Sequence, residues 1–342
     1  MGGKVTSLEV ARKAGVSRSA VSRVFTPGAS VSPATAAKVR AAARELGYRP
    51  NVLARSLITG RSRIIGLVVA YLENQFYPEA MERLSKSLQE RGYHVLIFMA
   101  GNDSAATQQV IDELLDYQVD GIVVASVGLS NDLTARCEDA GIPIVLFNRS
   151  QPDPRLSCVT SDNVAGGAKL ARFLIAGGHR RIGHIAGWEG ASTQIDREAG
   201  FRAVLEEAGL SLTARSLGNF HYDTAQTAAR EMFDRDDPPE AVFVANDHMA
   251  FAVMDVLRFE LGIRVPEDVS VVGYDDVALS AWPSYDLTTV RQRANGMVAE
   301  TVAILMARLE DMDTPPRRVS IDGPLIIRGS ARKPQGTPHE GI

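Results

Sequence analysis

The sequence has little cysteine and no long apolar run. Its two cysteines, Cys137 and Cys158, are too few for a disulfide framework, and neither has the spacing of a metal-ligand pair. No apolar run reaches the ~18 residues of a membrane span, and the N-terminal residues lack the apolar stretch of a secretory signal. We therefore expect a cytoplasmic protein that has neither disulfides nor a membrane anchor.

The motifs of several enzyme classes are also missing. The sequence contains no P-loop and no G-x-G-x-x-G fingerprint, so nothing indicates nucleotide chemistry. No nucleophile–base pair or cluster of metal ligands is evident, and His179 and His184 have no acidic or cysteine partner near them in the sequence. We expect a protein that is not an enzyme and that holds no cofactor and no metal.

Charge is distributed unevenly along the chain. Residues 1–63 contain twelve lysines and arginines but only two acidic residues, which gives a net charge of +10. Because the whole chain carries −4, the remainder carries −14. A basic segment joined to an acidic body is typical of a nucleic-acid-binding domain fused to another domain, although a solvated cationic face would give the same count.

The basic segment contains the signals of three helices. Thr6 and Glu9 have the spacing of a capping box, and the helix that they begin is followed by a glycine. Ser17 is positioned to cap a second helix over residues 18–25, and Ser32-Pro33 begins a third helix that ends at Gly47. Two short helices joined by a tight glycine turn predict a helix-turn-helix.

The second of these helices suits the major groove of DNA. Its polar residues are Arg18, Ser19, Ser22 and Arg23. Arginine can pair with guanine, and serine can donate to or accept from either base. The alternative is that these side chains contact only phosphates, which would fix the position of the helix without reading the sequence.

Residues 51–60 predict a short helix that begins at an asparagine and ends at a glycine. It is too short to be stable alone in water. Leu53 and Leu57 lie on one face of it, where Leu57 could wedge into a base step of the minor groove. A plain linker helix is the alternative.

From residue 64 onward, buried strands alternate with amphipathic segments. This alternation predicts two parallel sheets covered by helices on both faces, with ligands bound at the carboxyl ends of the strands. The predicted strands cover residues 64–69, 95–98, 121–124, 144–147, 182–185, 241–244 and 269–272.

The chain resembles the lactose-repressor/galactose-repressor (LacI/GalR) family over nearly its whole length. In the head, the matching residues are Val5-Thr6, Val10-Ala11, Ala14-Gly15-Val16-Ser17, Val21-Ser22-Arg23-Val24, Leu46-Gly47-Tyr48-Arg49-Pro50-Asn51 and Ala54-Arg55-Ser56-Leu57. In the body they include Asp162-Asn163, Arg197-Glu198-Ala199-Gly200-Phe201, Asn246-Asp247 and Val271-Val272-Gly273-Tyr274-Asp275-Asp276. The resemblance implies a hinge helix that orders on operator DNA and a core similar to periplasmic sugar-binding proteins.

The resemblance also suggests which residues bind. For DNA, the expected residues are Thr6, Ser17, Arg18, Ser19, Ser22, Arg23, Asn51, Ala54, Arg55 and Leu57. For a small-molecule effector, Arg197, Asn246 and Asp275 match family positions that bond the ligand, while Phe76, Tyr77, Phe220 and Ser126 are weaker candidates.

Each effector residue has a structural alternative. Asn246 could cap the helix that starts at Asp247, Asp275 could be a turn residue, and Arg197 could form a surface ion pair. The aromatic residues could stack on a sugar ring or simply pack in the core.

Four segments depart from the family pattern, one of which is the loop Thr26-Pro27-Gly28-Ala29-Ser30 with a composition of its own. Ser7 stands where an apolar residue is usual, Asn74-Gln75 replaces an asparagine–proline pair, and Tyr285-Asp286 stands where two prolines are common.

The expected fold class is α/β, with an all-α helix-turn-helix head and hinge helix joined to a core of two subdomains. The expected boundaries are 1–49 for the head, 50–63 for the hinge, 64–331 for the core and 332–342 for a tail. Within the core, subdomain one takes about 64–162 plus 292–322, and subdomain two takes about 163–291 plus 323–331.

The expected function is sequence-specific transcription regulation, with repression as the mode. A homodimer would bind an inverted repeat in double-stranded operator DNA, and a sugar or polyol effector would control its affinity. The alternative is a solute-binding protein of the periplasmic type, which would explain residues 64–331 but not the basic head. No leucine-heptad helix follows the core, so we expect a dimer.

Overall fold

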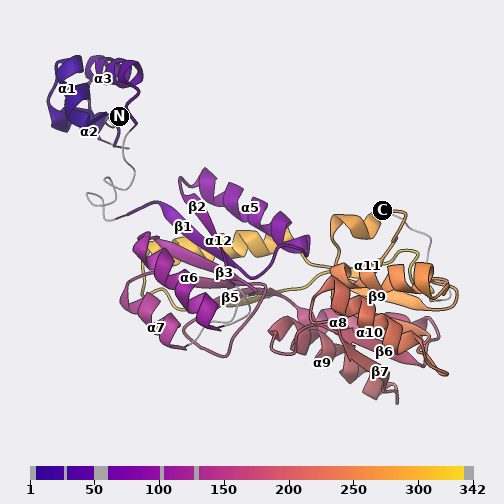
Figure 1. Cartoon of the computed structure of the whole chain (residues 1–342). Coiled ribbons are helices and arrows are strands. Elements are labelled where there is room, and N and C mark those ends of the chain that lie inside the picture. The colour runs from indigo at the N-terminus through magenta and orange to yellow at the C-terminus, as the bar shows by residue number, and fades with distance from the viewer. Residues whose placement is uncertain (1–4, 27–28, 50–60, 101–103, 127–130, 335–342) are drawn as a thin grey trace. The chain divides into compact units, whose positions relative to one another are not determined.

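The structure is a computed structural model that describes residues 5–26, 29–49, 61–100, 104–126 and 131–334. The chain divides into two compact units, Met1–Ser62 and Arg63–Ile342, which are called the head and the core below. Figure 1 shows the head as a small helical unit and the core as two lobes, each with a sheet and flanking helices. Within the described ranges, none of the helices combines the length and apolar character that crossing a bilayer requires.

The described part of the head contains α1 (Ser7–Ala14), α2 (Arg18–Val24) and α3 (Pro33–Leu46). The predicted capping box is confirmed, because Thr6 accepts from the Glu9 backbone N–H while the Glu9 carboxylate accepts from the Thr6 backbone N–H at 2.7 Å. Gly15 ends α1 in the left-handed conformation at φ 65°, as predicted. Short-range contacts therefore define where these helices begin and end.

A small apolar cluster holds the three head helices together. Its members come from all three helices and most have short side chains. They are Val10, Ala11, Val21, Val39, Ala42 and Ala43, with partly buried residues such as Leu46 and Tyr48 around them. A core of this size gives limited stability, which is usual for a domain of about 60 residues.

The first lobe of the core contains a parallel sheet in the order β11-β5-β4-β3-β1-β2. Its strands are β1 (Ile64–Val69), β2 (His94–Met99), β3 (Gly121–Ala125), β4 (Ile144–Phe147), β5 (Ser157–Ser161) and β11 (Arg318–Ile321). Its helices are α5 (Phe76–Glu90), α6 (Ser104–Asp116), α7 (Asn131–Asp139) and α12 (Ala294–Glu310).

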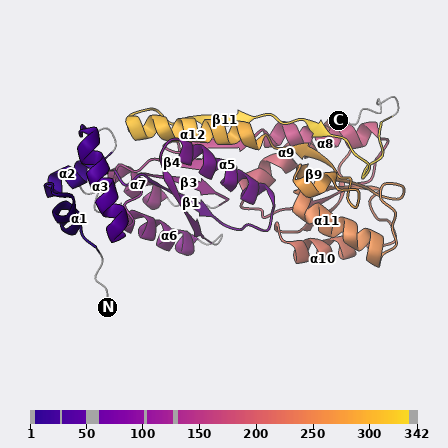
Figure 2. The same ribbon diagram turned by 90° about the horizontal axis from the view of Figure 1, so that it is seen from above.

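Alternating residues of the strands face opposite helix layers. Ile65 and Leu67 of β1 pack in one cluster with residues of α5 and α12, whereas Val68 belongs to another cluster with Ile111 and Leu114 of α6. Both faces are thus covered, as the continuous apolar runs of the strands predict. Figure 2 shows α12 and β11 running along one side of this lobe.

The second lobe repeats the plan with a sheet in the order β12-β10-β9-β8-β6-β7, in which only β12 is antiparallel among the described pairings. Its strands are β6 (Ile182–Ala186), β7 (Leu212–Leu217), β8 (Ala241–Val244), β9 (Ser270–Asp275), β10 (Thr288–Arg291) and β12 (Leu325–Ile326). Its helices are α8 (Asn163–Ala176), α9 (Ser192–Glu207), α10 (Tyr222–Phe233) and α11 (Asp247–Asp255), with single-turn elements at Val256–Glu260 and Ala278–Ala281.

Five strands are not predicted by the sequence pattern: β5, β7, β10, β11 and β12. They are short or polar. The edge strand β7 alternates between half-buried and exposed residues, and β5 reads Ser-Cys-Val-Thr-Ser. Pairing with a neighbouring strand, and not an apolar run, is what makes these segments strands.

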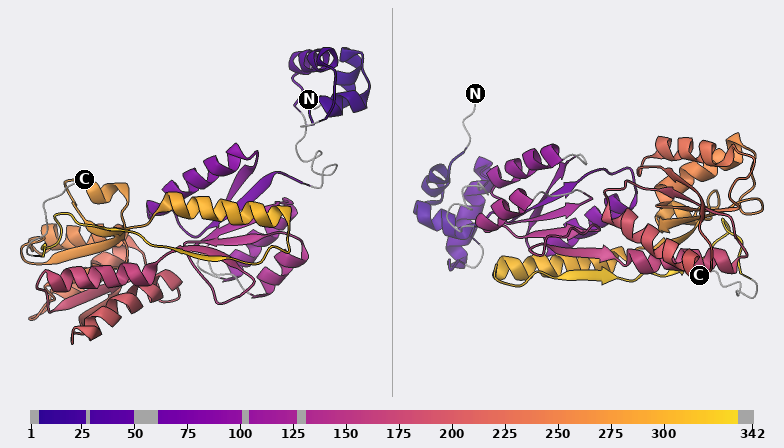
Figure 3. Two further views of the ribbon diagram at one scale, coloured as in Figure 1. Left: turned by 180° about the vertical axis from the view of Figure 1, so that it is seen from behind. Right: turned by 90° about the horizontal axis from the view of Figure 1, so that it is seen from below.

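The chain passes between the lobes three times. It leaves β5 for α8 through Asp162, leaves β10 for α12 through Gln292 and Arg293, and leaves β11 for β12 through residues 322–324. The views from behind and below show these connections side by side between the lobes (Figure 3). The fold class expected from the sequence is confirmed, while the predicted hinge helix lies outside the described residues.

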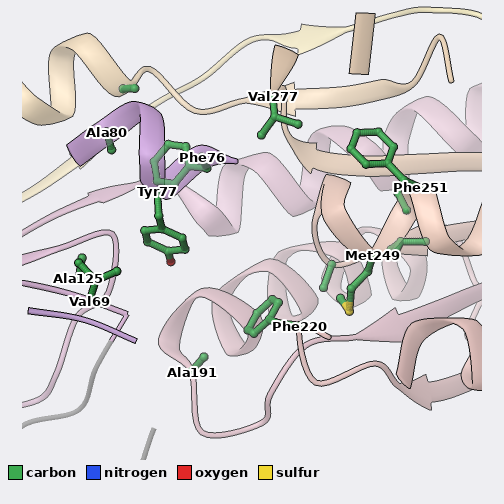
Figure 4. Packing of buried hydrophobic residues seen from close by; sticks show 14 of the residues in the cluster. Val69, Phe76, Tyr77, Ala80, Ala125, Ala191, Phe220, Met249, Phe251 and Val277 are labelled. Atoms are coloured by element: carbon green, nitrogen blue, oxygen red, sulfur yellow. The ribbon is translucent and has the colours of Figure 1, made fainter. Parts of the chain in front are cut away.

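One apolar cluster extends through both lobes. It joins Phe76 and Tyr77 of α5 with Phe220, Met249 and other residues of the second lobe. Figure 4 shows these side chains around the region where the two lobes meet. The contact between lobes is therefore partly apolar, and the polar groups described next are set into it.

Candidate DNA-binding head and effector site

The N-terminal half of α2 presents polar side chains to solvent, while Val21 on its other face is fully buried. A helix-turn-helix reads base edges with the first residues of its second helix. The exposed polar residues are Ser17, Arg18, Ser19, Ser22 and Arg23. Their exposure and position suit contact with DNA, which the structure by itself does not contain.

Some of these side chains already have partners in the head. The Arg18 Nε donates to Ser7 Oγ at 3.1 Å, and the hydroxyls of Ser17 and Ser19 lie 2.9 Å apart. Thr6 is engaged as the cap of α1. Ser7, which departs from the family pattern, thus orients Arg18. The remaining expected DNA contacts, Asn51, Ala54, Arg55 and Leu57, lie outside the described residues.

In the core, Asp275 ends β9 and its carboxylate has three donors. Oδ1 accepts from Gln292 Nε2 at 2.7 Å and from Arg197 Nη2 at 3.3 Å. Oδ2 accepts from Asn74 Nδ2 at 2.8 Å. Because Asn74 belongs to the first lobe, Arg197 to α9 and Gln292 to a crossover, this one buried carboxylate joins three separate parts of the core.

Arg197 is 2% exposed, and each of its three guanidinium nitrogens has an acceptor. Besides Asp275, it donates to Asn163 Oδ1 at 2.9 Å and to the Ala245 carbonyl at 2.7 Å, and it lies 3.7 Å from the centre of the Tyr274 ring. The ion pair is buried, unlike the surface pair considered as an alternative. Such a guanidinium is rigidly placed, which suits recognition of a polar ligand.

Close packing of two helices sets the position of Arg197. A Cβ on Gly167 of α8 would lie 2.0 Å from the Arg197 carbonyl oxygen, and one on Gly200 of α9 would lie 2.0 Å from the Val164 carbonyl. Only glycine at both positions lets α8 and α9 approach this closely. The glycine in the segment Arg197–Phe201 therefore has a packing role.

Asn246 acts as a helix cap in this structure. Its Oδ1 accepts from the Met249 backbone N–H at 2.9 Å, at the start of α11. The adjacent Asp247 accepts from Ser280 and Thr289 hydroxyls, each at 2.6 Å. The predicted alternative, in which Asn246 caps the helix that starts at Asp247, is thus observed. The capping contact does not prevent the same side chain from bonding a ligand.

Two buried carboxylates, Asp247 and Asp275, influence each other. Burial raises the pKa of Asp247 to about 7, and the charge of Asp275 adds to the shift. Burial also raises the pKa of Asp275, although Arg197 and the donors from Asn74 and Gln292 oppose the rise. Arg197 thus stabilises the charged form of Asp275, while the charge of Asp275 favours the protonated form of Asp247.

The first lobe contributes polar atoms at its strand ends. Ser126 follows β3, and Asn148 and Arg149 follow β4. Within the described ranges, four buried atoms here have no hydrogen-bond partner: Ser126 Oγ, Asn148 Oδ1, and Nε and Nη2 of Arg149. Buried polar atoms are nearly always bonded in proteins. These atoms are therefore available to a bound molecule.

Aromatic side chains surround these atoms. The Asn148 amide donates to the Tyr77 hydroxyl at 3.0 Å, and Arg149 lies 5.4 Å from the Trp188 ring of the second lobe. Tyr71 interacts electrostatically with both Arg149 and Asp275, so the two polar groups border one region. Phe76, Tyr77 and Phe220 are buried at this junction, whereas Trp282 is 56% exposed.

A cavity of about 540 Å³ adjoins Asp275. Phe76, Asp275 and Gln292 line it, together with charged residues of α5 and of the second crossover. Its volume falls in the range of small-molecule sites. In the described parts of the chain, no group of three or more His, Cys, Asp or Glu residues could hold a metal ion.

The structure therefore brings together Phe76, Tyr77, Arg197, Phe220 and Asp275 at the junction of the lobes, with Ser126 and Asn246 at neighbouring strand ends. Sequence reasoning did not propose Asn74, Asn148, Arg149 or Gln292. Each of these residues lies within two positions of the end of a strand or the start of a helix. A search for polar residues at every predicted strand end would have found Asn148 and Arg149.

Two family models match the sequence. The model described as "Bacterial regulatory proteins, lacI family" matches residues 7–51, and the model described as "Periplasmic binding protein-like domain" matches residues 171–331. The first covers the helix-turn-helix, and the second covers most of the second lobe and α12.

Curated relatives cover nearly the whole chain. The chain is 36% identical to the HTH-type transcriptional regulator CelR of Thermobifida fusca, over 94% of this chain and 96% of that protein. It is 31% identical to the ribose operon repressor of Escherichia coli (strain K12), over 95% of this chain and 99% of that protein.

Solved structures agree with these relatives. A transcriptional regulator CelR–cellobiose complex superposes with a TM-score of 0.72 at 35% identity, covering 96% of this chain and 100% of the other. The lac repressor dimer bound to operator and the anti-inducer ONPF superposes with a TM-score of 0.86 at 27% identity, covering 96% and 99%.

Proposed function

This chain belongs to the lacI family of bacterial regulatory proteins, and on that premise we propose that it represses transcription under the control of a sugar or polyol. It acts as a homodimer on an inverted repeat in double-stranded DNA. The effector binds between the two lobes of the core and changes the affinity of the head for the operator.

The observation that supports an effector site most strongly is the set of buried polar atoms without partners. Ser126, Asn148 and Arg149 offer both donors and acceptors at one end, and the Arg197–Asp275 pair lies at the other. Hydroxyl groups can donate and accept, so a polyhydroxylated ligand satisfies both kinds of group at once. The aromatic rings of Phe76, Tyr77 and Phe220 suit the apolar face of a sugar ring.

The relatives support the same chemical class. One solved relative holds cellobiose, and one curated relative is named for ribose, so sugars of different sizes act in this family. Other relatives are named PurR, which makes purines the natural competing class in a screen.

On the DNA side, α2 lies in the major groove with Arg18, Ser19, Ser22 and Arg23 toward the bases or phosphates. Asn51, Ala54, Arg55 and Leu57 follow it, and Leu57 wedges into a minor-groove step when the hinge helix orders. The alternative of a solute-binding protein has no use for a head with three capped helices and a net charge of +9, from eleven cationic and two acidic residues in 1–62.

A thermal-shift screen tests the effector class. Cellobiose, ribose, xylitol, hypoxanthine and guanine would each be added to the full-length protein. A ligand at 100 times its Kd adds ~2.7 kcal/mol to the free energy of unfolding. We expect a shift with at least one sugar or polyol. A shift with the purines alone would contradict the proposal.

Gel shifts with genomic fragments test the DNA side. Binding should be sequence-selective, should change when the active sugar is added, and should weaken with salt by roughly 0.9 in log K per log salt for each phosphate contacted. A protein that binds the sugar but retains no fragment would be a solute-binding protein instead.

A further inference from the structure

Asn74 lies between β1 and α5, and its side-chain amide has one partner on each side. It is 4% exposed. Its Oδ1 accepts from the Phe76 backbone N–H at 3.1 Å, and its Nδ2 donates to Asp275 Oδ2 at 2.8 Å, 201 residues away in the sequence. The two contacts fix the orientation of the amide, because only the oxygen can accept and only the nitrogen can donate.

The first turn of α5 depends on Asn74. The Gln75 side chain, at the N-cap position of α5, makes no capping hydrogen bond. The backbone N–H of Phe76 is bonded to the Asn74 side chain, and that of Tyr77 is bonded to the Asn74 carbonyl at 3.1 Å. Four orphan N–H groups begin every α-helix, and here Asn74 satisfies two of them.

The same turn carries residues of the candidate effector site. Phe76 and Tyr77 are its first residues, and Tyr77 accepts from Asn148 through its hydroxyl. Further along α5, Arg83 bonds Asn295 at the start of α12. A shift at the N-terminus of α5 would therefore reach both the aromatic wall of the site and the helix that follows the second crossover.

Both oxygens of Asp275 accept hydrogen bonds from side chains of the chain itself. A ligand hydroxyl that bonds Oδ2 must share it with the Asn74 amide or displace that amide. A ligand can shift a conformational equilibrium only through such a difference in contacts between two states.

We propose that Asn74 is a positioning residue that couples the carboxylate of Asp275 to the first turn of α5. When a ligand takes over Oδ2 of Asp275, the Asn74 amide loses its partner and the start of α5 is loosened. The ligand-driven step rests on the proposed function, whereas the coupling itself is a property of the ligand-free protein and is tested there first.

The central test separates coupling from simple helix capping by substituting Asn74→Asp. An aspartate at this position still accepts from the Phe76 N–H, and its charge favours a helix N-terminus. It has no N–H for Asp275, however, and it places a second carboxylate beside it. Capping alone predicts equal or stronger protection of α5, and coupling predicts weaker protection.

Hydrogen exchange of the full-length protein provides the readout. We expect the backbone amides in residues 76–80, which are those of Phe76, Tyr77, Glu79 and Ala80 because Pro78 has none, to exchange at least tenfold faster in Asn74→Asp than in the parent protein. Gln75→Ala is the matched control, because Gln75 is the adjacent amide residue and is exposed. Exchange in Asn74→Asp that equals or falls below that of the parent would overturn the proposal.

Two further variants guard against misfolding of Asn74→Asp. Asn74→Ser keeps a hydroxyl that can cap Phe76 but is too short to reach Asp275, so it should also raise exchange at residues 76–80. Asp275→Ala should raise exchange at the same amides from the other side, and adding Asn74→Ser, which keeps the cap, should raise it no further. Additive effects would mean that the two residues act independently.

Cellobiose, added to the parent protein at a concentration that raises its melting temperature, tests the ligand-driven step. Exchange at residues 76–80 should rise although the whole protein is stabilised, and Asn74→Ala should bind cellobiose at least as tightly as the parent does. Slower exchange at these residues on binding would contradict release of α5. If no sugar in the screen binds, the proposed effector class fails, while the ligand-free variants still decide the role of Asn74.

Discussion

The head and the core reach their structures by different routes. In the head, each helix begins at a residue that caps it from within three positions: Thr6, Ser17 and Ser32. In the core, the decisive polar contact joins Asp275 to residues 78 and 201 positions away. Local contacts thus set where the helices of the small basic unit begin, whereas the ligand-binding unit depends on long-range contacts for its polar site.

This difference has an energetic side. Capping contacts are exposed to water and contribute about 1 kcal/mol each. A buried charge is costly when its partner is removed, at about 3–5 kcal/mol. Substitutions of Asp275 or its partners in the core should therefore lower the free energy of unfolding more than substitutions of the caps. The effect of each substitution should remain confined to the unit that contains it.

The largest expected effect is that of Asp275→Ala. It leaves Arg197 buried without a counter-ion, so the free energy of unfolding of the core should fall by about 3–5 kcal/mol. Sugar binding should weaken at least tenfold, because a hydrogen bond to a charged group contributes about 1.5–3 kcal/mol. Denaturant titration and calorimetry with the active sugar measure the two effects.

The hydrogen-exchange protection of the head serves as the control for Asp275→Ala. Amides of α1–α3 should be unchanged in Asp275→Ala. Loss of protection in the head would break the distinction between the two units, and unchanged sugar affinity would show that the ligand binds elsewhere.

Next in size is Val21→Ala in the head. Val21 is fully buried in a cluster of small residues, so removal of two methyl groups should cost about 2 kcal/mol through lost burial and a cavity. Operator affinity should fall because less of the head is folded, while sugar affinity stays as in the parent. Gel shift and calorimetry on the same preparation check this, with the exposed Ser30→Ala as the control.

A smaller effect is expected for Thr6→Ala, which removes the capping box of α1. The expected cost is about 1 kcal/mol of head stability. Hydrogen exchange in α1 should become faster, with α3 as the internal reference. If α1 is as well protected as before, its start is held by the cluster around Val10 and Val21, and the head depends less on local contacts than we infer.

A last effect, which arises from titration and not from the loss of a contact, is a dependence on pH that belongs to the core alone. Burial holds the pKa of Asp247 at about 7, above its ordinary value of 3.8, so the folded state binds this proton more tightly than the unfolded state. The stability that results is fully present below about pH 4 and is lost as the pH rises through about 7.

Asp247→Asn should flatten the melting temperature between these pH values, because asparagine keeps an acceptor for Ser280 or Thr289 but does not titrate. Melting curves of parent and variant, subtracted at each pH, isolate this contribution. If the melting temperatures of parent and variant change with pH in parallel, Asp247 is ionised throughout, and its hydrogen-bond donors lower its pKa more than burial raises it.

The difference between short-range contacts in the head and long-range contacts in the core also decides how well the sequence predicts each unit. The capping box, the left-handed Gly15 and the starts of α2 and α3 could be predicted because cap and capped group lie within a few residues. The apolar strands β1, β3, β4 and β8 could be predicted from composition. The polar edge strands β5, β7 and β11 could not, because pairing with a neighbour defines them.

The same holds for the candidate site. Asp275 and Arg197 could be proposed from family resemblance, and the position of Asp275 at the end of β9 fits a ligand site. That they bond each other, and that Asn74 and Gln292 complete the cluster, depends on how two lobes meet. No periodicity in the sequence carries that information. Asn246 shows the contrast, because its capping contact with Met249, three residues away, could be predicted from the sequence.

The order of strands in the first sheet has a consequence for synthesis on the ribosome. β5 ends the first block of that sheet at Ser161, but its outer neighbour β11 begins only at Arg318. At roughly 5–20 residues per second, translation needs on the order of 10–30 s to supply β11 after β5 has emerged. Throughout that interval one edge of the nascent sheet has no partner strand, and an unpaired edge invites association with other chains. Translation speed between these two strands, and chaperones that reach the nascent chain in that interval, should therefore influence the yield of this protein more than they influence its final stability.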